Sequence, residues 1–174
     1  MKFFNTLFVL LLVSAGLQAQ VTDKAELAEL IKSKKFVFNA SAALPLNSLD
    51  MNRVMSRMQG GMNSGSMIQL NGMRYDVRLD GDTLKAYLPY YGRAFTAPYD
   101  QNDNGIKFSS TNFTYKETRK KKGGWVLVFN TKDVRDNHRF TLDISEKGYA
   151  TLVANSNNRQ SITFNGTIDK LKED

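Results

Sequence analysis

The feature that most constrains this chain is an alternation of apolar and polar residues in short runs after Met67. In residues 74–79, Tyr75, Val77 and Leu79 are separated by charged residues. Successive side chains of a strand point to opposite faces, so this period of two predicts a strand with one buried and one wet face. The same pattern recurs to the C-terminal end and predicts antiparallel β-structure.

Turn signals divide the pattern into strands. Asp80-Gly81 is typical of a two-residue hairpin turn. Further strands are predicted over residues 36–43, 83–88, 105–109, 112–118, 125–130, 139–144, 149–154 and 161–168. Many short strands joined by short turns predict an all-β antiparallel fold, either a barrel or a sandwich. Periodicity alone does not choose between the two.

A short helix is predicted ahead of the strands, over about residues 23–34. Leu27, Leu30 and Ile31 form one apolar stripe, and lysines gather at the C-terminal end, where the helix dipole favours them. We expect this helix to plug or flank the β-structure.

Residues 1–19 have the pattern of a cleaved secretory signal peptide, with Lys2 ahead of an apolar run and Ala19 at the cleavage site. The apolar run is too short for a membrane span of about 20 residues. The chain contains no cysteine, which excludes disulfides, cysteine-ligated zinc and a lipid anchor on cysteine. We therefore expect a single periplasmic or secreted domain over residues 20–174, without a membrane span.

Residues 47–66 form a methionine-rich insertion within that domain. Met51, Met55 and Met58 fall at helical spacing, and Gly60-Gly61 would end such a helix. Methionine adapts to irregular apolar surfaces. The insertion is either a lid over a pocket or a core-packing or flexible segment.

Residues 88–94 read LPYYGRA. Pro89 cannot sit in the middle of a sheet, and Gly92 permits a close backbone approach, so we expect a bend here. The segment resembles the LPYFGRA signature of the bacterial domain-of-unknown-function family 4251, with Tyr91 in place of phenylalanine. Similarity continues through Lys122-Gly-Gly-Trp125 and the C-terminal Ile162-Thr-Phe-Asn-Gly166. The resemblance implies a secreted, lipocalin-like barrel and assigns no catalytic residue.

Aromatic and arginine side chains near this bend are the candidate ligand-binding residues. Aromatic rings stack sugars or hold apolar ligands, and arginine anchors carboxylates or phosphates. The candidates are Tyr87, Tyr90, Tyr91, Arg93, Tyr99, Trp125 and Arg159. Aromatic residues in strands also build cores, and either arginine is equally suited to a structural ion pair.

The net charge of +7 favours anionic partners. Its densest run, residues 119–122, is expected at a hairpin tip, where lysines also discourage edge-to-edge aggregation. No aromatic residue interrupts the run, as base stacking would require, so we expect no nucleic-acid partner.

Few residues here suit catalysis or metal binding. Residues 100–105 match the first half of a calcium loop, but Thr111 stands where the bidentate glutamate is needed. His138 is the only histidine and is expected in an exposed turn. We expect no cofactor, no metal and no enzymatic activity.

The sequence therefore favours an exported, non-enzymatic binding module for a small amphipathic or anionic ligand, such as a small molecule, glycan or lipid. The ligand would enter the barrel mouth near Tyr90, Tyr91 and Arg93. The alternative is a cell-envelope structural or interaction protein that binds an envelope protein through its surface.

Overall fold

The computed structural model describes residues 24–46, 67–70, 72–95 and 105–171. Within them lie one helix and ten strands. The elements are α1 (Lys24–Ser33), β1 (Lys35–Pro45), β2 (Ile68–Gln69), β3 (Asp76–Asp80), β4 (Thr83–Leu88), β5 (Ile106–Ser110), β6 (Phe113–Arg119), β7 (Trp125–Thr131), β8 (His138–Ile144), β9 (Tyr149–Ser156) and β10 (Ile162–Lys170).

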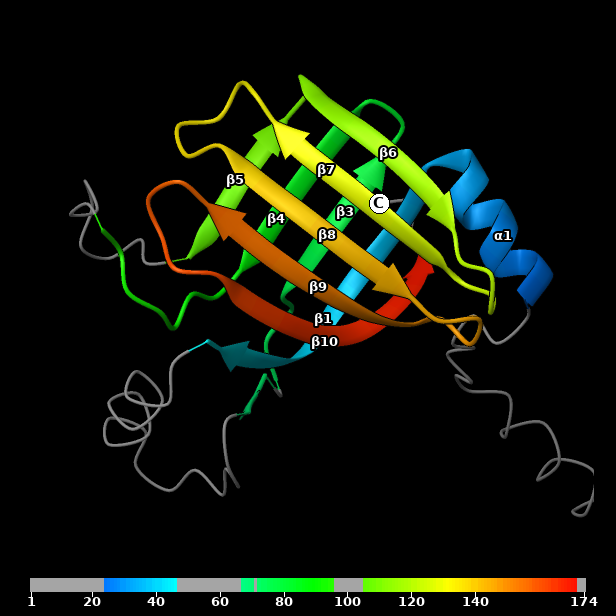
Figure 1. The fold of residues 1–174 in the computed structure, drawn as a ribbon, viewed down its shortest axis with the longest axis horizontal. Coiled ribbons are helices and arrows are strands. Elements are labelled where there is room, and N and C mark those ends of the chain that lie inside the picture. Colours follow the sequence, from blue (N-terminus) through cyan, green and yellow to red (C-terminus); the bar gives the residue numbers. More distant parts are fainter. Residues whose placement is uncertain (1–23, 47–66, 71, 96–104, 172–174) are drawn as a thin grey trace, which may run out of the picture.

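Nine strands form one antiparallel sheet in the order β5-β4-β3-β1-β10-β9-β8-β7-β6, and β2 pairs with β1 beside it. The sheet curls until its two halves face each other, with α1 at one end (Figure 1). Across the interior, the ring of Phe108 on β5 lies 5.6 Å from that of Phe140 on β8. The fold is thus a nearly closed barrel, which resolves the choice between barrel and sandwich.

Strand β1 joins the two halves of the sheet, because it pairs with β3 on one side and with β10 on the other. It faces β3 over Lys35–Asn39 and β10 over nearly its whole length. A bulge at Ser41 interrupts the register between Ala40 and Ala42. Bulges bend a strand and raise its twist, so this one helps to curl the sheet.

Gly166 on β10 lies opposite this bend. A Cβ atom there would lie 2.0 Å from the carbonyl oxygen of Asn39 and 2.9 Å from the ring of Phe38. Backbone and aromatic ring cannot both move aside, so only glycine fits at this closest approach of β1 and β10.

The barrel interior is filled by side chains. The large residues that are less than 2% exposed include Phe36, Phe38, Phe140, Phe164, Leu27, Ile31, Ile68, Leu79, Leu84, Leu88, Leu127 and Leu142. A side chain that lines a cavity large enough for water remains partly accessible to water, and these side chains are not accessible. These residues therefore form a close-packed core, in which each large side chain contributes about 1.5–3 kcal/mol to stability.

Helix α1 covers one end of this core, with Leu27 and Ile31 fully buried on one face. Lys24 pairs with Glu146 at 2.6 Å, and Glu26 pairs with Lys170. These ion pairs join the first turn of the helix to the β8–β9 turn and to the end of β10. The predicted stripe and the plugging role of the helix are confirmed.

The corner between β5 and β6 is held by Asp133 from the β7–β8 loop. Its carboxylate accepts hydrogen bonds from the Ser110 hydroxyl and from the backbone N–H groups of Thr111 and Asn112, the latter two at 2.9 and 3.0 Å. These bonds lower the pKa of Asp133. Asp133 therefore fixes the conformation of this turn. The strands that it connects, β5 and β6, are the two edges of the described sheet and do not pair with each other.

Two side chains differ from the alternation pattern. Tyr75 precedes β3 and is half-buried against Tyr87, a residue of the solvent face, instead of joining Val77 in the core. Asp76, expected to be wet, is 8% exposed, because Arg78 donates to its Oδ2 atom from Nε and Nη2. The predicted strands and the Asp80-Gly81 turn are otherwise present within one or two residues, whereas the 47–66 insertion lies outside the described residues.

We predict that Gly166→Ala destabilises the barrel by about 2 kcal/mol or more, because the new Cβ overlaps the Asn39 carbonyl. The midpoint of urea unfolding measures this effect. Thr163→Ala, on the same strand but facing outward, is the control and should cost less than about 1 kcal/mol. Equal midpoints for both variants would show that β1 and β10 do not require this close approach.

Candidate functional site

The LPYYGRA segment leaves β4 and forms a clasp with the loop between β9 and β10. The backbone N–H of Gln160 donates to the Arg93 carbonyl at 2.9 Å, and that of Phe95 donates to the Asn158 carbonyl at 2.8 Å. Ala94 and Arg159 form an antiparallel bridge between these bonds. The clasp is a miniature two-stranded ladder that closes one end of the barrel.

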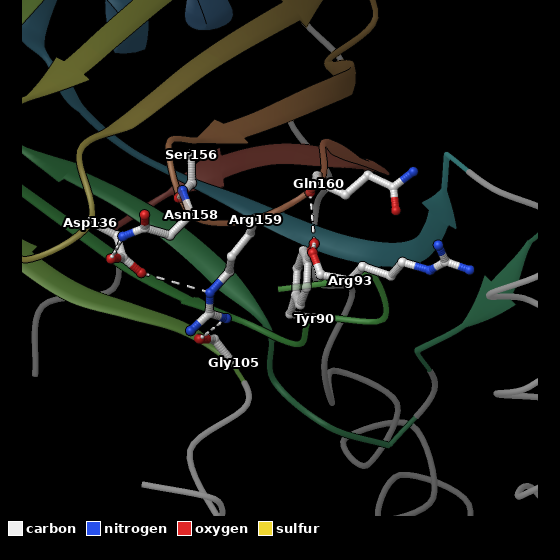
Figure 2. A network of polar contacts seen from close by, with 8 residues as sticks. All are labelled: Tyr90, Arg93, Gly105, Asp136, Ser156, Asn158, Arg159 and Gln160. Atoms are coloured by element: carbon white, nitrogen blue, oxygen red, sulfur yellow. Dashed lines mark hydrogen bonds and ion pairs between the residues drawn. The ribbon is translucent and has the colours of Figure 1, made fainter. Parts of the chain in front are cut away.

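Tyr90 stabilises this clasp by contacting both of its segments. Its hydroxyl lies 2.8 Å from the carbonyl oxygens of both Arg93 and Gln160, to which it donates (Figure 2). A Cβ at residue 92 would lie 2.5 Å from that hydroxyl. The glycine of the signature is thus required by the position of the tyrosine.

Arg159 ties the clasp to two further loops. Its Nη1 donates to the Gly105 carbonyl at 2.8 Å, its Nε lies 3.7 Å from Asp136 Oδ2, and its guanidinium lies 5.1 Å from the ring centre of Tyr90 (Figure 2). Asn158 donates to the other oxygen of Asp136 at 2.6 Å. These protein partners account for a side chain only 15% exposed, so the geometry gives Arg159 a structural role.

Tyr87 lies on the outer face of the barrel, 47% exposed. Its ring stacks on Tyr75 at a centroid distance of 5.7 Å and an interplanar angle of 20°. The ammonium of Lys107, from the neighbouring strand β5, lies 5.4 Å from the Tyr87 ring centre. Beside them Met73 is 67% exposed and accepts a hydrogen bond from the Tyr75 hydroxyl at 2.9 Å. We call Met73, Tyr75, Tyr87 and Lys107 the tyrosine patch.

Tyr91, the second tyrosine of the signature, is partly buried and packs against the hydrophobic core. Burial, and secondarily the electrostatic effect of Tyr75, raises the pKa of the Tyr91 hydroxyl. The phenol is therefore neutral at physiological pH. Tyr90 and Tyr91, adjacent in sequence, thus serve the clasp and the core respectively.

The remaining predicted site residues do not converge here. Trp125 is 3% exposed at the start of β7, and β7 carries the chain about 20 Å before the loops at the clasp end begin. It belongs to the core, with Arg119 5.6 Å from its ring. The side chain of Arg93 extends away from the Tyr90 ring (Figure 2). Tyr99 lies outside the described residues, as does most of the 100–105 segment.

His138 is not in an exposed turn, contrary to the sequence-based expectation. It begins β8 with its side chain 7% exposed, and its ring stacks on Phe108 at 4.9 Å. Its backbone N–H donates to the Thr131 hydroxyl, and it pairs with Ser156 of β9, so it shares the inward face of β8 with Phe140. Burial lowers the His138 pKa from 6.5 to about 4, and Nδ1 has no partner among the described residues.

Sequence reasoning missed Tyr75, Met73 and Lys107. Tyr87 was a candidate because it is aromatic, but nothing local in the sequence indicated that Lys107 pairs with it across β4 and β5. No group of three or more histidine, cysteine, aspartate or glutamate side chains suited to a metal occurs in the described part of the chain. The helix that this part contains is too short and polar to cross a membrane.

Fold and site together define a small antiparallel barrel with a solid core, a clasped end and an aromatic patch outside. Residues 18–168 match the family described as a domain of unknown function, DUF4251, and the chain belongs to this family. A crystal structure of a DUF4251 family protein from Bacteroides eggerthii aligns with a TM-score of 0.55 at 14% identity, covering 87% of this chain and 89% of that one. At this identity the likeness shows the fold alone. No curated protein matches the sequence.

We predict that Tyr90→Phe destabilises the protein by about 1–2 kcal/mol, because the Gln160 carbonyl loses this donor and the Arg93 carbonyl keeps only the backbone N–H of Gln160. Urea unfolding measures the change. Tyr149→Phe removes a hydroxyl from a residue 61% exposed and should leave the midpoint unchanged. If Tyr90→Phe were equally silent, the hydroxyl would not fasten the clasp.

We also predict that stability falls as the pH drops from 6.5 towards 4, because the unfolded chain protonates His138 in this window while the folded chain does not. The displaced pKa corresponds to about 3 kcal/mol. His138→Phe retains an aromatic ring beside Phe108 and should flatten the pH dependence of the unfolding free energy within this window. Identical slopes in the native protein and the variant would contradict a buried, neutral imidazole.

Proposed function

We propose that this protein is an exported, non-enzymatic binding module that holds its ligand on the tyrosine patch. The observation that carries the proposal is the stacked Tyr75–Tyr87 pair, ordered by its own contacts yet with Tyr87 47% exposed. Exposed tyrosines that are already rigid lose little conformational entropy on binding, which makes them effective contact residues.

The packed interior supports a surface site. Most large side chains of the barrel core are almost fully buried, whereas Tyr87 on the outer face is open to solvent. An amphipathic or anionic ligand would instead lie across β3, β4 and β5, with its apolar face on the tyrosines and its polar groups near Lys107. Export is supported by the signal-peptide pattern of residues 1–19, most of which precedes the family match beginning at residue 18.

We predict that Tyr87→Ala weakens binding of octyl β-glucoside, an amphipathic test ligand, by about tenfold below its micelle concentration. Titration followed by amide chemical shifts measures the affinity and maps the site. Tyr149→Ala, on β9, is the matched control, because Tyr149 is more exposed than Tyr87 and lies on a distant strand. Unchanged affinity in Tyr87→Ala, or shifts confined to other strands, would reject the patch as the site.

The alternative is a cell-envelope interaction protein that works through the β6–β7 hairpin. Lys120 in this turn pairs with Asp143 at 2.5 Å, whereas Lys121 and Lys122 are exposed at its tip. If an envelope protein binds there, charge reversal at Lys121 and Lys122 should weaken its recovery from envelope extract. Recovery that instead depends on Tyr87 would favour the patch.

A further inference from the structure

We propose that two neighbouring turns at the α1 end of the barrel form a docking surface for the anionic phospholipid headgroups of a membrane. The surface consists of Lys121 and Lys122 in the β6–β7 turn and Lys147 in the β8–β9 turn, and we call these three residues the basic tip. It is separate from the tyrosine patch, so the inference does not rest on the proposed function. Three observations support it: the position of the turns, the pairing of the adjacent acids, and the exposure of the lysines.

The strand register places the two turns side by side. Trp125, which begins β7 after the first turn, pairs with Arg119 of β6 and with Ile144 of β8. Both turns therefore leave the sheet from the same row of residues. They also contact each other, since a Cβ atom on Gly123 would overlap the carboxyl group of Glu146. The basic tip thus belongs to one end of the barrel, beside α1 (Figure 1).

Hydrogen bonds order the backbone of both turns. In the first turn, the N–H of Lys120 donates to the Gly124 carbonyl at 3.0 Å, and that of Gly123 donates to the Lys120 carbonyl at 3.1 Å. In the second, the N–H of Ser145 donates to the Tyr149 carbonyl at 2.8 Å. The lysines are therefore presented from a fixed backbone and remain close to one another.

The acids next to these turns in β8 and the β8–β9 turn are already paired. Glu146 pairs with Lys24 at 2.6 Å, and Asp143 pairs with Lys120. The three lysines of the basic tip are exposed and take part in none of the ion pairs between described residues. The tips of the two turns therefore present three positive charges, as charge complementarity with an anionic surface requires.

The composition of the turns favours a membrane over a protein partner. Residues 120–123 and 145–148 contain no aromatic or aliphatic side chain larger than the lysine stem. Protein interfaces depend on buried aromatic and apolar anchors, which these turns lack. Anionic lipids instead spread negative charge over a plane, and each lysine near that plane adds its own attraction. Two adjacent turns at one end of a barrel can approach such a plane together.

The experiment is sedimentation of the protein, prepared without its predicted leader over residues 1–19, with sucrose-loaded vesicles. One set of vesicles contains phosphatidylcholine alone, and the other is an equal mixture with phosphatidylglycerol. At low salt we expect binding to the mixed vesicles only. We expect about 0.2 M salt to release the protein, because screening weakens the attraction between exposed charges. Free glycerol 1-phosphate, which carries the same charged group without a bilayer, should not compete.

Two variants of equal net charge locate the surface. The first neutralises the basic tip: Lys121→Gln, Lys122→Gln and Lys147→Gln. It should bind the mixed vesicles at least about fiftyfold more weakly, since each lysine near an anionic membrane contributes about fivefold. The control removes the same charge from exposed positions elsewhere on the barrel: Lys85→Gln, Lys132→Gln and Arg139→Gln. It should retain most of the binding. Both should unfold at the urea midpoint of the parent protein, because the replaced side chains are exposed.

Equal weakening in the two variants would overturn the inference, because it would assign binding to net charge and not to the basic tip. Equal binding to both kinds of vesicle, or to neither, would also overturn it. Competition by glycerol 1-phosphate would show a site for one small anion instead of a membrane surface. An envelope protein that requires these three lysines, while mixed vesicles do not bind, would assign the surface to a protein partner and reject the membrane.

Discussion

The structure depends on the close-packed apolar core that forms where the curled sheet brings its two halves face to face. Phenylalanines from β1, β8 and β10 meet leucines from the opposite strands, and α1 covers one end with Leu27 and Ile31. Without cysteine, no disulfide compensates for a weakened core. This packing supports the proposal that a ligand binds on the outer face of the barrel.

The LPYYGRA segment has a structural role in this fold. Its first tyrosine and its glycine build the clasp, in which Tyr90 bonds the carbonyls of two segments and Gly92 makes room for Tyr90. Arg159, 66 residues further along the chain than Arg93, completes the closure through Gly105 and Asp136. The signature thus maintains this end of the barrel.

The sequence predicted the fold more fully than the site because alternation and turns are local. The two-residue hairpin at Asp80-Gly81 and the strand Thr83–Leu88 follow directly from these signals. The site depends on which strands become neighbours. Trp125 and Tyr87 looked alike as aromatic residues of strands, but one faces the core and the other faces solvent beside Lys107.

His138 shows the same limit at the level of one residue. Its polar neighbours suggested a turn, yet it begins β8, where it pairs with Ser156 of β9 and its ring packs on Phe108. Asp76 is the converse case, since Arg78 allows a carboxylate to be buried on a face that alternation marks as wet. The position of His138 is set by strand neighbours that sequence spacing does not reveal, whereas Asp76 is buried by an ion pair within its own strand.

The central claim is that the core is full and that binding occurs outside it. Native mass spectrometry of the protein purified without detergent tests this claim most directly. We expect the mass of the polypeptide alone, with no bound lipid or other apolar molecule. A stoichiometric apolar ligand that persists in Tyr87→Ala and leaves only on unfolding would contradict the account, because such a ligand would have to occupy the interior.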